Sequence, residues 1–407
     1  MHDVIGAYQR IEQMYRLYLK SAFPLRSPVL SEERDRVLTR PGVLSQPPLI
    51  EPVPVYESSG LDLNGAGARL PVEYRDLAAL GQNLFGSGMT LYRHQMASLE
   101  EVIANRRDLV VTTGTGSGKT ECFLLPLLAQ LARESATWKK AGTPDPQQRY
   151  WWRDSGGRVS QWSHIQRPAA LRAVILYPLN ALVEDQLRRL RMTFDNNDIH
   201  NWLDKHRQGN RITFGRYTGQ TPVPGLKDNP QRLRILKDHL YDMDQQYQTI
   251  LKGVQAQQLD PDILPYFPRP DGGEMWSRWD MQETPPDILI TNYSMLNIMM
   301  MRRIESDIFE RTRQWLSEPD HPEREFFLII DELHAYRGTS GTEVSYILRL
   351  LLTRLGLTPD SPKLRIIATT ASIEDNQKGR DFLRQFFGRD RFAFITGQQR
   401  QIGRAHV

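Results

Sequence analysis

Short apolar runs alternate with stretches of helical spacing through most of the chain. The runs are rich in Val, Ile, Leu and Phe and lack a clean alternation of polar and apolar positions. Such runs are typical of strands buried on both faces of a parallel sheet that helices cover. We therefore predict an α/β doubly wound domain with strands at residues 108–113, 173–177, 211–217, 287–291, 326–330 and 364–368.

The N-terminal region has a different pattern. Apolar side chains recur at three- and four-residue steps from Val4 to Leu19, which predicts an amphipathic helix with one buried stripe. A second short helix is expected after Ser31, whose hydroxyl can cap it. Prolines concentrated in residues 41–54 then indicate an extended segment. We expect an N-terminal arm at residues 1–82 and the main domain at residues 83–397.

Two polar segments interrupt the predicted α/β pattern. Residues 134–170 are rich in turn-forming residues, and residues 223–286 form a charged stretch with helical spacing. Both are predicted to be insertions in loops of the core. The first insertion carries tryptophans that either anchor it to the domain or stack on the bases of a single strand. These are Trp138, Trp151, Trp152 and Trp162.

Composition narrows the class of protein. The 407 residues are 40% apolar and 25% charged, which excludes a coiled coil, a collagen-like rod or a wholly disordered chain. The net charge of +4 is too small to indicate nucleic-acid binding by itself. The single cysteine, Cys122, excludes an intramolecular disulfide and favours a reducing cytoplasm. The start is no signal peptide and no run of about 18 uncharged apolar residues occurs, so we expect a cytoplasmic protein without a membrane span.

The segment TGTGSGKT at residues 113–120 follows one predicted strand and precedes a helical pattern. Its glycines let consecutive backbone N–H groups point inward, and the helix N-terminus adds positive potential, so the loop can cradle a triphosphate. Lys119 then reaches the β- and γ-phosphates, and Thr120 offers its hydroxyl to Mg²⁺. The alternative is a glycine-rich turn without a ligand. The predicted nucleotide contacts are Thr113, Gly114, Thr115, Gly116, Ser117, Gly118, Lys119 and Thr120.

Asp331 and Glu332 follow five apolar residues and are therefore expected at another strand end. We predict that Asp331 holds Mg²⁺ through water and that Glu332 is the general base for the attacking water. The alternative is that the pair only caps the next helix. His334, two residues beyond Glu332, is either structural, a sensor of the γ-phosphate, or a link between the carboxylates and a nearby polar segment.

The pairing of TGTGSGKT with DELH resembles superfamily 2 helicases of the DEAD/DEAH-box type. Further segments match motifs of that superfamily in the expected order, from Leu91 to about Gly397. They are LYRHQ at 91–95, YPLNALVEDQLRRL at 177–190, GRYTGQT at 215–221, PDILITNYSML at 286–296 and ATTASI at 368–373. The sequences TNYSML and DELHAYRG are most similar to large bacterial Lhr-like and DUF1998-containing helicases, some of which act in DNA repair or antiviral defence.

The resemblance implies a RecA-like P-loop NTPase lobe that binds ATP and Mg²⁺ and couples hydrolysis to movement along nucleic acid. Gln95 would hydrogen-bond adenine through both of its amide groups. Thr113 replaces the usual first glycine of the phosphate loop, a position that makes the turn. Thr370 and Ser372 replace the family's Ser-Ala-Thr motif with the hydroxyls exchanged, and they would couple motif III to the carboxylates.

The resemblance also implies a track for a strand, with DNA favoured over RNA. Small hydroxyls and backbone N–H groups at strand ends would hold phosphates without reading bases. Arg188, Arg189 and Arg191 either add positive charge there or form a solvated helix face. The expected contacts are Pro178, Asn180, Ala181, Thr218, Gly219, Thr291 and Asn292.

Helicases of this type close ATP between two RecA-like lobes, and the second lobe supplies an arginine finger. Only 34 residues follow Ile373, too few for a second domain of about 100 residues. We therefore expect an N-terminal fragment of a longer helicase, with a truncated end at residues 398–407. The last six residues, IGRAHV at 402–407, match a translated sequencing-adapter read and are expected to be foreign to the protein.

A second class of function stays open at this point. The chain could be a nucleotide-dependent switch or scaffold that remodels a protein partner without unwinding a duplex. The arm or the two insertions would then carry that partner.

Overall fold

The computed structural model describes residues 4–23, 25, 27–40, 42–46, 55–85, 88–114, 116–143, 149–154, 157–227 and 229–398. The chain divides into two compact units, Met1–Pro54 and Val55–Val407, and each is described by itself. The division lies before the boundary expected near residue 83, because residues 55–82 pack into the core of the larger unit. Buried side chains from this stretch are Ala66, Leu70, Tyr74, Leu77 and Leu80.

The smaller unit contains two helices, α1 (Val4–Ala22) and α2 (Pro28–Leu38). Lys20 Nζ of α1 lies 2.6 Å from Asp35 Oδ2 of α2, and this ion pair joins the helices. The helix expected after Ser31 begins earlier, at Pro28, because a missing N–H costs nothing in the first turn of a helix. The predicted amphipathic helix forms.

The apolar stripe of α1 is not buried among the described residues. The exposed fractions of Ile11, Tyr15 and Tyr18 are 67%, 49% and 59%. Most of the proline-rich segment predicted to be extended falls outside the described residues, as does the tail at 402–407. No described helix is both long and apolar enough to span a membrane.

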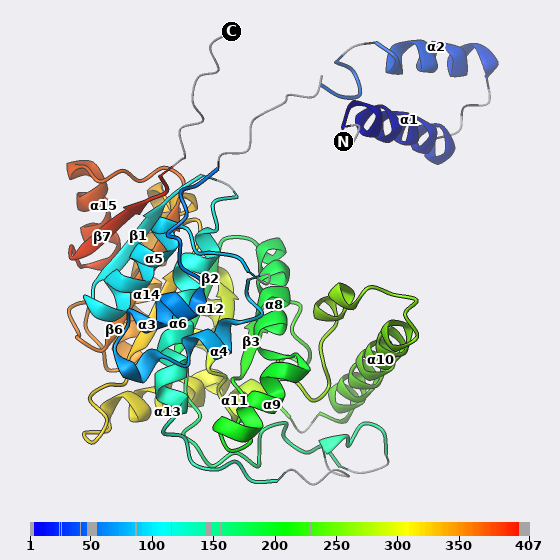
Figure 1. The fold of residues 1–407 in the computed structure, drawn as a ribbon. Helices are drawn as coiled ribbons and strands as arrows, with labels where there is room; N and C mark the ends of the chain where they lie inside the picture. The colour runs from blue at the N-terminus through cyan, green and yellow to red at the C-terminus, as the bar shows by residue number, and fades with distance from the viewer. Residues whose placement is uncertain are drawn as a thin grey trace. The chain divides into compact units, whose positions relative to one another are not determined.

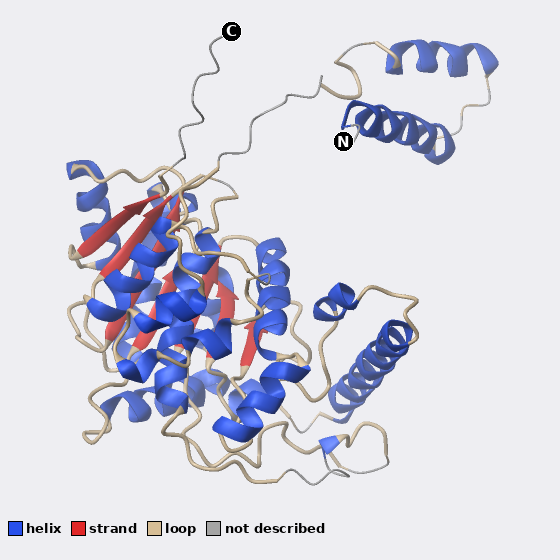
Figure 2. Ribbon diagram, in the orientation of Figure 1, coloured by secondary structure: helices blue, strands red, loops and turns tan. Residues whose placement is uncertain are grey.

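The larger unit is built on a parallel sheet of seven strands in the order β3-β4-β2-β5-β6-β1-β7 (Figures 1 and 2). Six strands lie where the apolar runs predict them, and β7, at the edge beside β1, is not predicted. This is the α/β RecA-like lobe expected from the sequence. The strands are β1 (Asp108–Thr112), β2 (Ala173–Tyr177), β3 (Phe214–Tyr217), β4 (Ile288–Asn292), β5 (Phe326–Ile330), β6 (Leu364–Thr370) and β7 (Phe392–Thr396).

Helices cover both faces of the sheet, so the central strands are buried on both sides (Figure 2). One face, with Ile175 and Ile329, packs against α3 (Leu63–Ala68), α4 (Leu77–Gly81), α5 (Arg93–Leu99), α6 (Lys119–Ser135), α8 (Asn180–Phe194) and α9 (Asn197–His206). The opposite face, with Val174 and Leu328, packs against α12 (Tyr293–Met301), α13 (Ser306–Ser317), α14 (Gly338–Arg354) and α15 (Gln377–Phe387). Two-sided burial explains why the apolar runs lack alternation.

The two insertions pack against each other. Trp151 and Trp152 of the first insertion share an apolar cluster with Leu236 of α10 (Pro230–Gln255) and with Trp279 of α11 (Arg278–Glu283). The ring of Trp152 lies 4.6 Å from that of Trp276, centroid to centroid. All four tryptophans predicted in the first insertion are at least nine-tenths buried. They anchor the insertion, and the alternative of an exposed base-stacking platform is wrong.

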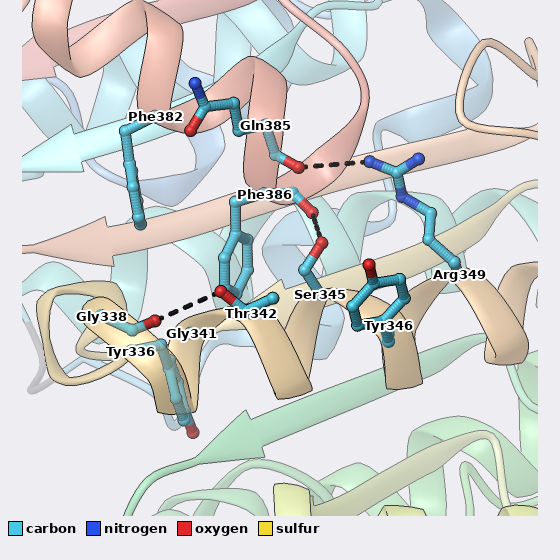
Figure 3. A pocket seen from close by; sticks show the side chains of 10 residues that line it. All are labelled: Tyr336, Gly338, Gly341, Thr342, Ser345, Tyr346, Arg349, Phe382, Gln385 and Phe386. Carbon is cyan, nitrogen blue, oxygen red and sulfur yellow. Dashed lines mark hydrogen bonds between the residues drawn. The ribbon is translucent and has the colours of Figure 1, made fainter.

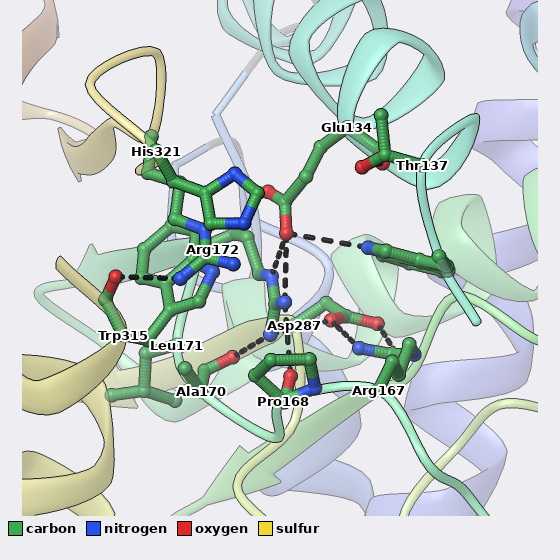
Figure 4. A network of polar contacts seen from close by, with 12 residues as sticks. Glu134, Thr137, Arg167, Pro168, Ala170, Leu171, Arg172, Asp287, Trp315 and His321 are labelled. Atoms are coloured by element: carbon green, nitrogen blue, oxygen red, sulfur yellow. Dashed lines mark hydrogen bonds and ion pairs between the residues drawn. The ribbon is translucent and has the colours of Figure 1, made fainter. Parts of the chain in front are cut away.

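A buried network of charges fixes the amino ends of β2 and β4 (Figure 4). Arg167 donates two hydrogen bonds to Asp287, at 2.7 and 2.6 Å. Arg172 Nη1 lies 3.2 Å from Asp287 Oδ1, and Arg172 Nη2 donates to Glu134 at 2.7 Å. Asp287 also accepts from the backbone N–H of Thr213 at 2.7 Å. Two arginines and two carboxylates compensate one another where the first insertion meets the sheet.

Removal of Asp287 is expected to destabilise the larger unit strongly, because it leaves two buried guanidinium groups without their shared partner. The variant Asp287→Ala should lose about 3–5 kcal/mol of unfolding free energy in urea denaturation. The matched control is Asp204→Ala, which breaks the pair of the half-exposed Asp204 with Arg211 (2.6 Å) and should lose less than about 1 kcal/mol. Equal losses in the two variants would contradict this account of the network.

Candidate functional site

The carboxyl ends of β5, β6 and β1 lie side by side because β6 pairs with both neighbours. Ile330 is in register with Ala368, and Thr112 is in register with Thr370. The phosphate loop after β1 and the carboxylates after β5 therefore flank the end of β6. The sheet brings together three segments that are far apart in the sequence.

The phosphate loop has the backbone conformation that its glycines allow. Gly116 and Gly118 have φ of +74° and +73°, and α6 begins at the next residue, Lys119. Ser117 Oγ donates to Thr113 Oγ1 at 2.5 Å, so these two hydroxyls close the loop internally. A Cβ at Gly118 would lie only 2.3 Å from Gln95 Nε2. Thr115 lies outside the described residues.

Two side chains of α5 support the phosphate loop from behind. His94 Nε2 donates to the Ser117 carbonyl at 2.7 Å, and burial lowers the pKa of this imidazole. Gln95 Nε2 donates to the Gly118 carbonyl at 3.3 Å, while Gln95 Oε1 accepts from the Tyr92 N–H at 2.9 Å. Both amide groups of Gln95 are therefore engaged within the protein. The predicted contact between Gln95 and adenine stays a prediction, and the role of His94 is not evident from the sequence.

Lys119 and Glu332 form an ion pair across the site. Lys119 Nζ lies 3.2 Å from Glu332 Oε1. Glu332 has a left-handed backbone with φ of +53°, unusual for a residue with a side chain. The turn directly after β5 presents this carboxylate to the phosphate loop. The two groups with the predicted phosphate and water-activating roles thus face the same space.

Asp331 is buried beside the end of β6. Its Oδ1 accepts from the Glu332 N–H at 3.1 Å and is hydrogen-bonded to the hydroxyl of Thr369. The Glu332 N–H also lies 3.2 Å from Thr369 Oγ1. Burial raises the pKa of Asp331, and the Thr369 hydrogen bond opposes that shift. Thr369 is therefore the residue that holds both acidic positions in place.

The sequence predicts a coupling role for Thr370 and Ser372, which stays a prediction, and the structure adds Thr369 as the hydroxyl that contacts Asp331. Thr370 Oγ1 accepts from the Ser372 N–H at 3.3 Å, within its own turn. Side chains alternate along a strand, so Thr369 emerges on the face that carries Asp331 and Thr370 on the other. Ser372 Oγ instead accepts from Arg337 at 2.9 Å, which joins the turn after β6 to the segment after β5.

His334 lies between the carboxylates and the turn after β6. Its Nδ1 is 3.2 Å from Glu332 Oε2 and 3.5 Å from the Ala371 backbone N–H. As a donor Nδ1 bonds the carboxylate, and as an acceptor it bonds the N–H group. This geometry favours the predicted link to a nearby polar segment over a γ-phosphate sensor or a purely structural histidine.

The expected strand contacts lie at the ends of β2, β4 and β3, which are neighbours in the sheet. The Thr291 hydroxyl is fully buried and donates to the Tyr217 carbonyl at 2.7 Å, while Thr218 is 1% exposed. Asn292 Oδ1 caps α12 by accepting from Met295 N–H at 2.8 Å. These side chains have structural partners, whereas Gly219 faces open space. Of the remaining positions, Pro178 follows β2, and Asn180 and Ala181 begin α8.

The three arginines of α8 make contacts within the protein. Arg191 is 6% exposed and donates to Glu274 at 2.5 and 2.9 Å. Arg189 bonds Glu121 of α6 and also Asp185, the latter at 3.0 Å. Arg188 lies over the ring of Tyr266, 5.1 Å from its centroid. Neither the strand track nor a fully solvated helix face describes this set.

The side chains around the phosphate loop fit a hard cation that a triphosphate brings with it. Thr120 and Asp331 offer oxygen ligands, which Mg²⁺ prefers, and Mg²⁺ is usually held by one or two such groups together with phosphates and water. Among the described residues, no three His, Cys, Asp or Glu side chains gather into a metal cage. The oxygen atoms of Thr120 and Asp331 therefore fit Mg²⁺ that is bound together with a triphosphate.

A cavity lies elsewhere in the lobe, between α14 and α15 (Figure 3). Its volume is about 550 Å³, and Tyr336, Tyr346, Arg349 and Phe382 are among its lining residues. No residue predicted to bind nucleotide or nucleic acid lines it. Burial and the charge of Asp331 both raise the pKa of the Tyr336 hydroxyl in the wall of this cavity.

Comparison with known proteins supports the resemblance seen in the motifs. The DEAD/DEAH box helicase family model matches residues 92–221. The Druantia protein DruE of Escherichia coli (strain UMEA 4076-1) is 31% identical over 428 residues, which cover 95% of this chain and 21% of DruE. An uncharacterized ATP-dependent helicase of Methanocaldococcus jannaschii is 22% identical over 303 residues, which cover 74% of this chain and 28% of that protein. The chain spans less than a third of either relative.

Solved structures of helicases are similar to this chain over part of their own length. The DUF1998 helicase MrfA bound to DNA has a TM-score of 0.45 at 19% identity, covering 86% of this chain and 32% of MrfA. The Mycobacterium smegmatis helicase Lhr bound to ssDNA and AMP-PNP has a TM-score of 0.45 at 17% identity, covering 81% of this chain and 28% of Lhr.

Loss of the Thr369 hydroxyl is expected to slow ATP hydrolysis, because Asp331 and the Glu332 backbone lose a shared partner. In single-turnover assays with protein in excess, Thr369→Val should reduce the rate about tenfold. The matched control Thr370→Val removes the neighbouring hydroxyl and should reduce it less than about threefold. A larger loss for Thr370→Val would instead favour Thr370 as the coupling residue, as the sequence predicts.

Proposed function

We propose, from the DEAD/DEAH box helicase domain that this chain carries, that the larger unit is the first motor lobe of an ATP-dependent nucleic-acid helicase or translocase. One observation carries this proposal: Lys119 and Thr120 after β1 face Asp331 and Glu332 after β5, with Lys119 Nζ 3.2 Å from Glu332 Oε1. A glycine-rich turn without a ligand, or a helix cap, would not require these two groups to meet.

Each of these side chains has a distinct role in the proposed reaction. Lys119 and the N–H groups of residues 114–118 bind the phosphates of ATP. Thr120 and Asp331 hold Mg²⁺, which when bound neutralises phosphate charge. Glu332 orients the attacking water and takes its proton. Thr369 keeps Asp331 and Glu332 in position.

The Lys119–Glu332 ion pair joins the proposed phosphate-binding group to the proposed base. The side chains of Lys119 and Glu332 are 13% and 28% exposed, so their attraction is only partly screened by solvent. Lys119 can bind an incoming γ-phosphate only if its ion pair with Glu332 breaks. Breaking the pair frees the carboxylate for water, so binding of ATP and activation of the base are coupled.

The nucleic-acid track is proposed along the ends of β2, β4 and β3, beside the ATP site. With the hydroxyls of Thr218 and Thr291 occupied, phosphate contacts would come from backbone groups near Gly219 and at the start of α8. Such contacts read no bases. We propose DNA rather than RNA as the strand, on the resemblance to Lhr-like and DUF1998-containing helicases.

Hydrolysis by this lobe is proposed to be slow. An arginine finger from a second lobe contributes about three to five orders of magnitude in related phosphoryl-transfer systems. Closure of a second lobe over ATP would supply that charge and couple hydrolysis to strand movement.

Neutralising the base is expected to tighten ATP binding while it stops hydrolysis. Glu332→Gln removes a negative charge near the γ-phosphate and releases Lys119 from its ion pair. The dissociation constant of ATP should fall about fivefold, equivalent to about 1 kcal/mol, in equilibrium titrations. Single-turnover hydrolysis should drop at least about a hundredfold. Unchanged hydrolysis would show that Glu332 is not the base.

Single-stranded DNA binding should weaken steeply with salt, because the proposed contacts are to phosphates. Fluorescence anisotropy with a thymidine oligonucleotide at increasing salt measures this, and a uridine oligonucleotide provides the RNA comparison. We expect tighter binding of the DNA strand. No binding of either strand at low salt would instead favour a nucleotide-dependent switch that acts on a protein partner.

A further inference from the structure

Two buried polar groups beside the proposed ATP site have no partner among the residues that the structure describes. They are the hydroxyl of Tyr177, at the end of β2, and Oε1 of Gln186, on α8. Tyr177 is fully buried and Gln186 is 5% exposed. The roles assigned above use neither residue. Buried polar groups in native proteins normally have a partner, so these two call for one.

The sheet places Tyr177 next to Asp331. The Asp331 N–H donates to the Leu176 carbonyl at 3.1 Å, which continues the pairing of β2 with β5 by one residue. Ile175 and Ile329 share one core cluster, so Tyr177 and Asp331, two residues further along each strand, emerge on that same face. The charge of Asp331 adds to the effect of burial in raising the pKa of Tyr177 far above its ordinary value.

Gln186, on α8, lies beside the same site. Its Nε2 lies 3.4 Å from Thr120 Oγ1, the hydroxyl that the proposed function assigns to Mg²⁺. The carboxamide thus contacts one proposed cation ligand, while Tyr177 lies beside the other. The two groups without partners flank the position between Thr120 and Asp331.

We propose that Tyr177 and Gln186 are positioning residues for the hydrated Mg²⁺ that accompanies ATP, with the Gln186 Oε1 and the Tyr177 hydroxyl taking hydrogen bonds of its hydration shell. This inference rests on the proposed ATP-binding function. Mg²⁺ in nucleotide sites usually keeps several waters, and those waters need acceptors. Partners that orient such a shell have a measurable effect on metal affinity.

Tyr336 provides a natural comparison. Its hydroxyl is also buried without a partner among the described residues, and Asp331 also affects its pKa. Tyr336 belongs, however, to the core cluster on the opposite face of the sheet from Tyr177. Proximity to Asp331 is therefore not sufficient for the proposed role. The side chain must also lie on the face of the sheet that carries Thr120 and Gln186.

The test compares binding of a fluorescent ATP analogue to the full chain in EDTA and in Mg²⁺. Gln186→Met and Tyr177→Phe keep the size of each side chain and remove the polar group. In EDTA, each variant should bind the analogue with the same affinity as the unaltered chain. The factor by which Mg²⁺ increases that affinity should be about tenfold smaller in each variant. Gln186→Glu keeps an acceptor oxygen and should retain the tightening.

Two controls address purely structural effects. Gln130→Met removes a carboxamide whose Oε1 is likewise buried without a described partner, near the far end of α6, and Tyr336→Phe removes the comparison hydroxyl. Both should leave the effect of Mg²⁺ unchanged, and thermal melting checks that all variants fold.

The outcomes separate this inference from the function on which it rests. Full Mg²⁺ tightening in folded Gln186→Met and Tyr177→Phe would overturn the inference and leave ATP binding standing. Equal losses in the two controls would overturn it as well. No analogue binding by the unaltered chain would overturn the proposed function, and this inference with it.

Discussion

Parallel pairing of β5, β6 and β1 is the constraint on which the site depends. The carboxyl ends of parallel strands meet at one edge, and β6 between the other two sets the distance across which the phosphate loop faces the carboxylates. The main contacts of the site join segments at the carboxyl ends of different strands: Lys119 to Glu332, Thr369 to Asp331, and His334 beside Ala371. None of these pairs is close in the sequence. A change of register in β6 would separate all of them together.

The amino ends of the strands, on the far side of the sheet from the site, carry buried charges. There, Arg167, Arg172, Glu134 and Asp287 are buried and compensate one another's charge. Buried ion pairs of this kind contribute little when complete and cost much when one member is removed. The network ties the first insertion to the amino ends of β2 and β4, and the tryptophan cluster ties that insertion to the second. The buried charge network thus lies at the amino ends of the strands, and the reactive groups lie at the carboxyl ends.

The sequence predicts the parts of this lobe that depend on local pattern. Apolar runs give six of the seven strands, and the loop at residues 113–120 is recognisable because its glycines and Lys119 are contiguous. The pattern does not predict β7, an edge strand that is buried only over its first two residues. Nor does it single out Thr369, because the choice between two adjacent threonines depends on which face of β6 each occupies. Local spacing does not reveal that.

Other differences arise from contacts that only the fold creates. Gln95 is expected from the motif to meet adenine, which stays a prediction, and its bond to the Gly118 carbonyl, 23 residues away in the chain, is not evident from the motif. The sequence leaves open whether the tryptophans of the first insertion anchor it or form a base-stacking platform. Trp151 and Trp152 are buried against a second insertion whose proximity the sequence does not show. Arg191 and Arg189 of α8 find Glu274 and Glu121 for the same reason, whereas the pair of Arg189 with Asp185 is local, one turn apart on the helix.

The central claim is that the carboxyl ends of β1, β6 and β5 form an ATP site built around Lys119. Equilibrium titration of the full chain with a fluorescent ATP analogue in Mg²⁺, compared with Lys119→Ala, tests it most directly. We predict saturable binding at one site per chain and loss of at least about tenfold in affinity in the variant, since a charge-assisted phosphate contact is removed. Absence of binding, or equal affinity of the two proteins, would contradict the account.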